Sequence, residues 1–507
     1  MLSKYNKIAL MLPLALGLGA CEKGFEEFNT NPNQPLTVSP DALLTGAETA
    51  TAFRLFDVPA NMDGGLLIAQ HWAKSQYTTE DRYSFRSTSY QSIWDGFYTG
   101  TAALPGGLKD FNELLRIGKE SNNPNMQAVA LVMRSYYFSV LTDIFGDIPY
   151  SDALKLSTTV NVITPKYDKQ EDVYKGLLAD LKQATTLLKQ KSTMAVGGDV
   201  MFGGNMTKWE KFSNSLRLRL AMRAIDANEG LAKPEIADVL NGSNLLMTSN
   251  ADNAQVVFLS AQPNTNPVFE NRLTRDDHRV SQSITSVLSR RKDPRLPIYA
   301  NPAECAAKPD DKSVPDSTGL YRGIKNGLTN PVAQRGPLCS MSKVGDYFTK
   351  ADAPGVLMTW SEVLFFTAEA RARGIVTGDA EAAYNSAIRA SMAQYGITDV
   401  AAVDAYIAQP LVKYNKTSLE TQKASIGTQK WIALYGQGVE AWSELRRLDY
   451  PFLSLPASPV GAAGGKLPVR FRYPSNEQSL NQANYTAAVA RQGADLIRTR
   501  LWWDVKN

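Results

Sequence analysis

Hydrophobic residues recur at helical spacing over several long stretches of this 507-residue chain. After Asn123–Pro124, a pair typical of a helix start, apolar side chains share one stripe as far as residue 144. Two further long amphipathic helices are predicted, one following Thr164–Asp168 and one over 208–225. Shorter helices are expected at 40–56, at 281–289 and from 481 to near 504. The periodicity predicts a mainly all-α protein.

Residues 360–395 hold the clearest architectural pattern, in which an apolar helix, a glycine-containing turn and an alanine-rich helix follow one another. Ala380 and Tyr384 lie on one face of the second helix, and small residues there let two antiparallel helices approach closely. This is the packing pattern of a tetratricopeptide repeat. Residues 124–144 and 168–189 form a candidate second pair. We therefore expect a tetratricopeptide-like scaffold of helical hairpins with a large loop-rich region and little β-structure.

Two stretches, 250–283 and 301–357, lose the helical period and are rich in turn-forming residues. Loops that leave a helical scaffold are where binding residues tend to lie. The second stretch contains Cys305 and Cys339, an even pair that is a candidate disulfide in an exported protein. The alternative is two unrelated free thiols. Two such cysteines and two histidines cannot form a thiolate zinc site, and no metal or cofactor is predicted.

The segment over residues 65–98 is dense in aromatic side chains with polar groups between them. Trp94, Phe97 and Tyr98 recur at helical intervals and are assigned to the core. Other rings lie in a polar, turn-rich context, where a flat face suits a sugar or an apolar peptide side chain. Together with polar residues of the 250–283 stretch, they form the candidate ligand-binding set: Trp72, Tyr77, Arg82, Tyr83, Phe269, Arg272 and Asp276.

Catalytic chemistry finds little support along the chain. Asp276–His278 offers two carboxylates and an imidazole, but adjacent residues rarely point at one atom. No phosphate loop, nucleophile elbow or zinc-protease helix is evident. With 54 basic and 50 acidic residues, the near-neutral charge gives no electrostatic case for nucleic acid. The 44% hydrophobic content allows a large core, and we expect one soluble body without a second apolar run of spanning length.

The N-terminus has the anatomy of an export signal. Lys4 and Lys7 precede the apolar run Ile8–Leu18, which is shorter than a membrane span, and Ala20–Cys21 ends it. This resembles a bacterial lipoprotein signal in which Cys21 becomes the acylated N-terminus; the alternative is an ordinary secretory peptide with an incidental cysteine. We therefore divide the chain into three parts: a signal peptide over 1–20, a lipidated tether over 21–38 and a single helical domain over 39–507.

Short motifs spread along the chain resemble the SusD/RagB-like nutrient-binding outer-membrane lipoproteins of the Bacteroidetes. In chain order they are Cys21 followed by Phe25–Asn33, Phe145–Ser151, Thr164–Asp168, Trp209–Arg219, Asp293–Arg295, Gln429–Trp431, Glu440–Trp442 and Arg470–Pro474. Each is weak alone, and their joint occurrence in this order is specific. Ligand residues vary within the family, so no motif transfers a binding residue to this chain.

The resemblance implies four tetratricopeptide-like helix pairs with a loop-rich ligand face. It implies a non-enzymatic protein that captures oligosaccharides, or peptides, for a SusC-like TonB-dependent barrel. It also implies lipid anchoring in the outer membrane, facing the exterior, since Glu22, Glu26 and Glu27 are similar to the family's surface-export signals. Two alternatives stay open: a surface lipoprotein hydrolase using paired carboxylates, and a tetratricopeptide scaffold that binds no small ligand.

Overall fold

A computed structural model describes residues 38–101, 104–155, 162–306, 319–334, 338–460 and 466–505. The α-helices are α3 (Pro40–Phe56), α4 (Leu66–Ile68), α5 (Ser87–Tyr98), α6 (Leu108–Glu120), α7 (Pro124–Phe145), α8 (Gln170–Leu188), α9 (Met206–Ala224), α10 (Glu229–Asn241), α11 (Pro267–Thr274), α12 (Gln282–Arg290), α13 (Leu296–Tyr299), α14 (Asn330–Ala333), α15 (Trp360–Ala372), α16 (Ala380–Gln394), α17 (Val400–Ile407), α18 (Leu419–Ala433), α19 (Gly438–Leu448), α20 (Ser475–Leu480) and α21 (Gln482–Gln492). Shorter helical segments are η1 (Val58–Gly65), η2 (Glu80–Arg82), η3 (Asn250–Asp252), η4 (Leu338–Ser340) and η5 (Asp346–Phe348). The strands are β1 (Trp72–Lys74), β2 (Ile148–Pro149), β3 (Tyr167–Asp168), β4 (Ala254–Val257), β5 (His278–Val280) and β6 (Pro354–Met358). The predicted mainly helical fold is confirmed.

Side-chain caps and proline fix where the predicted helices begin. The Ser39 hydroxyl accepts a hydrogen bond from the Ala42 amide at 3.2 Å, and the Asn123 side chain accepts one from the Met126 amide at 3.1 Å. Helices α3 and α7 both start with proline, which lacks an N–H at a position where no helical bond would use it. The helix predicted over 40–56 is therefore confirmed.

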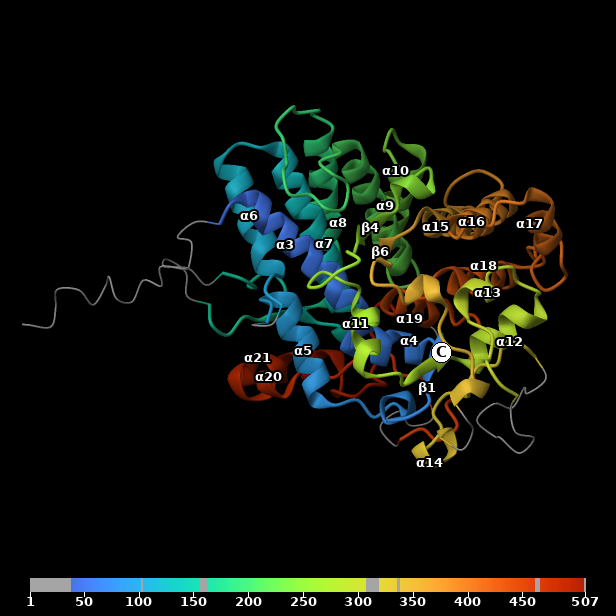
Figure 1. The fold of residues 1–507 in the computed structure, drawn as a ribbon. Helices are drawn as coiled ribbons and strands as arrows, with labels where there is room; N and C mark the ends of the chain where they lie inside the picture. Colours follow the sequence, from blue (N-terminus) through green and yellow to red (C-terminus); the bar gives the residue numbers. More distant parts are fainter. Residues whose placement is uncertain are drawn as a thin grey trace, which may run out of the picture.

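Consecutive helices pack as pairs, and four pairs build the scaffold: α7 with α8, α9 with α10, α15 with α16, and α18 with α19. Figure 1 shows α6 to α10 arrayed together and α15 to α18 forming a second group beside them. The pair predicted over residues 360–395 corresponds to α15 and α16. The pair predicted over 124–144 and 168–189 corresponds to α7 and α8.

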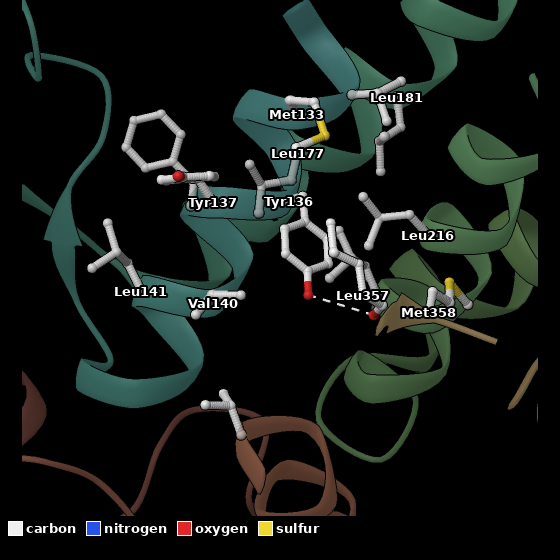
Figure 2. Close-up of a cluster of buried hydrophobic side chains, with 14 of the residues drawn as sticks. Met133, Tyr136, Tyr137, Val140, Leu141, Leu177, Leu181, Leu216, Leu357 and Met358 are labelled. Carbon is white, nitrogen blue, oxygen red and sulfur yellow. Dashed lines mark hydrogen bonds between the residues drawn. The ribbon is translucent and has the colours of Figure 1, made fainter. Parts of the chain in front are cut away.

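Helix α7 differs from its predicted amphipathic form because it is buried on nearly every side. Figure 2 shows its side chains Met133, Tyr136 and Val140 among residues of α8, α9 and β6. The Tyr136 hydroxyl donates to the Leu357 carbonyl oxygen at 3.4 Å. By length and composition this helix could cross a membrane, contrary to our expectation, but 94% of the apolar window is buried inside the molecule. A core helix of a soluble protein meets the same test.

Buried ion pairs connect different helix pairs. Arg219 of α9 meets Glu362 of α15 at 2.6 Å, and Arg447 of α19 meets Glu369 of α15 at 2.6 Å. All four side chains are at most 3% exposed. Removing one partner of such a pair leaves an uncompensated buried charge, at a cost of about 3–5 kcal/mol. These pairs therefore fix how α9, α15 and α19 sit against one another.

Strands in the described residues form two-stranded antiparallel pairs, β1 with β5, β2 with β3 and β4 with β6. Strand β6 begins within the stretch 301–357, which we expected to be loop and which also contains short helical segments. The last helix ends at Gln492 and not near 504, because Gly493 takes a left-handed backbone (φ 106°) that ends the helix.

A disulfide joins Cys305 and Cys339, with their Cα atoms 5.3 Å apart, which decides between the two alternatives left open for this pair. The assignment of Trp94, Phe97 and Tyr98 to the core is also confirmed, since each is at most 9% exposed. The signal peptide and Cys21 lie outside the described residues. The division of the chain into signal, tether and domain stays a prediction.

Candidate functional site

Two segments that the sequence analysis proposed separately meet in the structure through a short strand pair. Strand β1 runs antiparallel to β5, with Trp72 opposite Val280 and Lys74 opposite His278. Beyond the strands, the Ser75 amide donates to the Asp277 carbonyl oxygen at 2.7 Å. The residues around 72–83 and those around 269–278 therefore share one surface, although about two hundred positions separate them.

Further hydrogen bonds fix the turn that follows β1. The Gln76 side-chain amide donates to the Asp277 carboxylate at 2.6 Å. The Thr78 amide donates to the Asn330 side chain at 2.8 Å, which brings α14 to the same surface. Tyr77 lies between these anchors with a positive φ of 52°. A non-glycine residue held in this conformation carries backbone strain, which the anchors on both sides offset.

The anchored turn holds the Tyr77 ring towards solvent. Tyr77 is 52% exposed, whereas most aromatic residues of the described chain are buried. The Arg275 guanidinium lies 5.1 Å from the ring centroid, on the side of α11. This arginine also lies 3.6 Å from Asp277. One face of the ring is thus covered by a cation, an arrangement that orients the ring without burying it.

Charged groups continue this surface along the C-terminal end of α11. Asp276 lies 3.5 Å from Arg272 and 3.0 Å from Arg279. Arg272 and Asp276 are partly exposed, and both line a cavity of about 10 Å³ together with Trp72. Three of the predicted ligand residues therefore meet around one small cavity.

Trp72 and Tyr83 do not form the exposed platform that their polar neighbours suggested, because each is only 1% exposed. The Trp72 indole donates to the Tyr435 hydroxyl at 3.1 Å, which holds its ring in the interior. Arg82 is partly buried and donates to the Ser458 carbonyl oxygen at 2.8 Å, so it anchors a loop. Phe269 is partly buried on α11. Of the four predicted aromatic residues, Tyr77 is the most exposed.

Beneath this surface, Asp63 of η1 links the two strands. Its carboxylate lies 3.0 Å from the Lys74 ammonium and 2.8 Å from the His278 ring nitrogen. Burial raises the pKa of Asp63, but the hydrogen bond and charge of His278 and the charge of Lys74 outweigh burial and hold the pKa below its ordinary value. The carboxylate is therefore ionised at neutral pH and keeps β1 and β5 in register.

Asp81 of η2 organises the other side of the turn. One oxygen accepts from the Gly327 amide at 2.8 Å and the other from the Asn326 side chain at 2.8 Å. Burial raises the pKa of this fully buried carboxyl to about 6, although these hydrogen bonds act in the opposite direction. Asp81 thus ties the 326–327 segment to the turn that carries Tyr77.

An aromatic cavity of about 30 Å³ is also lined in part by Trp72, and it was not predicted. Its walls carry aromatic rings with side-chain amides between them. They include Tyr347, Phe348, Tyr395, Tyr435, Asn266, Gln394 and Gln437. The volume is close to that of one water molecule, so a sugar ring would not fit without movement of the walls. These residues come from four distant segments, and no local pattern in the sequence indicates that they meet.

The surface offers binding chemistry more than reaction chemistry. A ring face, a side-chain amide and alternating charges suit reversible contact with a polar ligand that has apolar faces. Among the described residues, no cluster of three or more His, Cys, Asp or Glu side chains is arranged to hold a metal ion.

Comparison with known proteins identifies the family. The family described as "SusD-like_2: Starch-binding associating with outer membrane" matches residues 32–474. The chain therefore belongs to the SusD-like family, a family of nutrient-binding proteins associated with the outer membrane. No curated protein sequence matches the chain significantly.

Solved structures agree over nearly the whole chain. A chitin-binding protein is similar with a TM-score of 0.79 and 28% identity, covering 92% of this chain and 100% of that one. A chitin-binding SusD homologue from Flavobacterium johnsoniae has a TM-score of 0.76 and 25% identity, with 92% and 98% covered. An outer membrane protein from Bacteroides vulgatus, described as involved in nutrient binding, has a TM-score of 0.75 and 26% identity, with 92% and 100% covered.

Proposed function

We propose that this protein is a cell-surface lipoprotein that captures oligosaccharides, or peptides, and delivers them to a SusC-like TonB-dependent transporter. The observation that carries the capture step is the β1–β5 pairing, which gathers an exposed Tyr77 ring, the Gln76 amide and the Arg275–Asp277 pair on one surface. A sugar presents apolar C–H faces edged by hydroxyl groups, so a ring flanked by hydrogen-bonding groups is complementary to it.

The ligand class that we favour is a chitin-type oligosaccharide. Two of the similar structures are chitin-binding proteins, at 28% and 25% identity. An aromatic contact contributes about 1 kcal/mol, so one exposed ring with a few hydrogen bonds gives modest affinity. Modest affinity suits hand-over, because a tightly held ligand would leave too slowly for the transporter to take it.

Anchoring at the outer membrane follows, in this proposal, from acylation of Cys21. The family's association with the outer membrane supports it. Burial of acyl chains in a bilayer contributes a binding free energy of about 0.8 kcal/mol per methylene group, so a multiply acylated cysteine would hold the domain without a spanning helix. Cys21→Ser should therefore move the protein from the membrane fraction to the soluble fraction. An unchanged membrane fraction would contradict the anchor.

Calorimetric titration of the full chain tests the capture step directly. Chito-oligosaccharides, α-glucan oligosaccharides and short peptides are titrated in turn, and each sample is then analysed for cleavage products. We expect saturable binding with intact ligand. Cleavage products would identify a hydrolase instead. A transporter complex that forms without any small-ligand binding would identify a scaffold.

The Tyr77 ring offers a matched pair of variants. Tyr77→Ala removes the ring and should weaken glycan binding about 5- to 10-fold, since one aromatic contact contributes about 1 kcal/mol. Tyr77→Phe keeps the ring face at the same backbone position and should bind within about twofold of the parent. Both variants should unfold at the parent temperature, because the side chain is half exposed. If both bind as the parent does, Tyr77 is not part of the site.

A further inference from the structure

A larger cavity, which shares no lining residue with the cavities of the candidate site, is lined mainly by residues near the C-terminal end of the described chain. Its volume is about 430 Å³, within the range of sites that hold small organic ligands. Its walls come from the end of α19, the loop that follows it, residues 466–469 and residues 498–504.

The floor of the cavity carries a buried arginine. Arg446 is 5% exposed, and its guanidinium lies 4.0 Å from the centre of the Trp442 ring and 4.8 Å from that of Trp503. It donates to three backbone carbonyl oxygens and to the Ser443 hydroxyl, all of them neutral acceptors. In the described part of the chain, no carboxylate lies within 4.0 Å of this guanidinium. The carboxylates of Asp143 and Asp504 act on the guanidinium electrostatically from beyond ion-pair distance. A buried cation without a direct counter-ion favours an anion in the space next to it.

More positive charge surrounds the opening. Lys466 and Arg498 are exposed and Arg500 is partly buried, and the charge of Arg500 acts on the Asp504 carboxyl group. The lining holds two carboxyl groups, Asp449 and Asp504. Four cations therefore face two carboxyl groups across a concave, partly apolar wall, where the positive potential is focused.

The remaining wall is apolar and partly open to solvent. Phe452 is 88% exposed and Leu455 is 40% exposed, on the loop that follows α19. Both side chains line the cavity together with Leu445 and Leu467. An aromatic residue this exposed at the mouth of a cavity provides a flat surface for the apolar part of a ligand.

We propose that this cavity binds a small organic carboxylate, with the anionic group towards Arg446, Arg498 and Arg500 and the apolar part against Phe452. The same chemistry can come from an oligosaccharide that carries a uronic acid or from an amino acid or peptide C-terminus. A neutral oligosaccharide lacks the group that the cations select. The site is therefore distinct in charge from the surface around Tyr77.

Paired acid and neutral probes test this assignment on the full chain. The sugar pair is a disaccharide with a terminal glucuronic acid and the matched disaccharide with a terminal glucose. The amino-acid pair is N-acetyl-leucine and N-acetyl-leucine amide. We expect at least one acid to bind saturably and its neutral partner to bind at least tenfold more weakly. The acid that binds identifies the source of the carboxylate.

Variants at the rim keep the test independent of folding. Arg498→Gln with Arg500→Gln should weaken acid binding at least tenfold, and Phe452→Ala should weaken it several-fold. Arg116→Gln is the matched control, because Arg116 is an exposed arginine of α6, with its side chain 54% exposed, and should change nothing. The double arginine variant is also titrated with a chito-oligosaccharide, the neutral ligand proposed for the surface around Tyr77. Unchanged binding of this ligand separates the cavity from the proposed capture function.

Three results would overturn the proposal: neither acid binds, each acid binds no better than its neutral partner, or the double arginine variant binds the acid as the parent does. Loss of neutral glycan binding in the Tyr77 variants bears only on the capture site.

Discussion

His71 is a histidine that the fold holds without charge, and its titration gives a quantitative test of the packing behind the candidate site. The ring is fully buried and its Nε2 lies 3.1 Å from the Trp431 carbonyl oxygen. The rings of Trp431 and Tyr435 are centred 4.9 and 5.3 Å away. Burial lowers the pKa of His71 from 6.5 to about 3, and the hydrogen bond to Trp431 offsets only part of this effect.

The sign of the effect follows from proton linkage. Between pH 6.5 and about 3 the unfolded chain binds a proton at this ring and the folded protein does not. Stability therefore falls as pH falls through this window. His71 alone should lower the free energy of unfolding by about 2 kcal/mol between pH 8 and pH 5. The full loss reaches about 5 kcal/mol at or below pH 3, at about 1.36 kcal/mol per pKa unit.

His71→Gln isolates this contribution. Denaturant unfolding of parent and variant at pH 8, 7, 6 and 5 gives the difference in unfolding free energy at each pH. At pH 8 the difference reports lost packing alone. It should shrink by about 2 kcal/mol by pH 5, because only the parent loses stability through this ring while the titrations of the carboxyl groups are common to both. A difference that stays constant with pH would refute the reasoning.

Three further predictions concern stability. Arg295→Met should lower the free energy of unfolding, measured by thermal unfolding, by about 3–5 kcal/mol. In the parent, Arg295 lies 2.7 Å from the fully buried Asp293, and the substitution leaves that carboxylate without its counter-charge. Glu48→Gln should become more stable relative to the parent as pH rises from 5 to 8. Burial, followed by the charge of Asp199, raises the pKa of Glu48, so ionisation of this carboxyl group destabilises the folded parent and not the variant. Reducing the Cys305–Cys339 disulfide should lower the unfolding free energy by about 3–4 kcal/mol, from the 34-residue separation that it closes, with an unchanged value contradicting this.

Local signals in the sequence were sufficient for several of the helices. The cap and proline that start α3 act within four residues, so the predicted bounds of 40–56 match the structure. The same holds for the hairpin over 360–395, where the turn and the small residues are neighbours in sequence. The end of the last helix was mistaken because one glycine, Gly493, ends it before the apolar residues that follow.

The binding surface was only partly predictable because the burial of β1 and the exposure of the turn after it depend on residues that lie far away in the chain. Trp72 lies between His71 and Ala73, and a three-residue strand does not reveal from sequence that all of its side chains are buried. Tyr77 becomes exposed because hydrogen bonds to Asp277 and Asn330 hold the turn outward. Both partners lie far away in the chain. Arg275, which covers the Tyr77 ring, was not among the predicted ligand residues, because its contact with a residue so distant in the chain is not evident from the sequence.

The loop after α19 gives a physical reason to ask whether the two proposed sites act together. Its Ser454 carbonyl oxygen accepts from Gln70 at 2.6 Å, and its Ser458 carbonyl oxygen accepts from Arg82 at 2.8 Å. The same loop carries Phe452 at the mouth of the C-terminal cavity. Contact alone does not couple two sites, because coupling requires an element with two arrangements that both ligands bias. The loop is held at both positions by backbone acceptors, which favours a single arrangement and hence two independent sites.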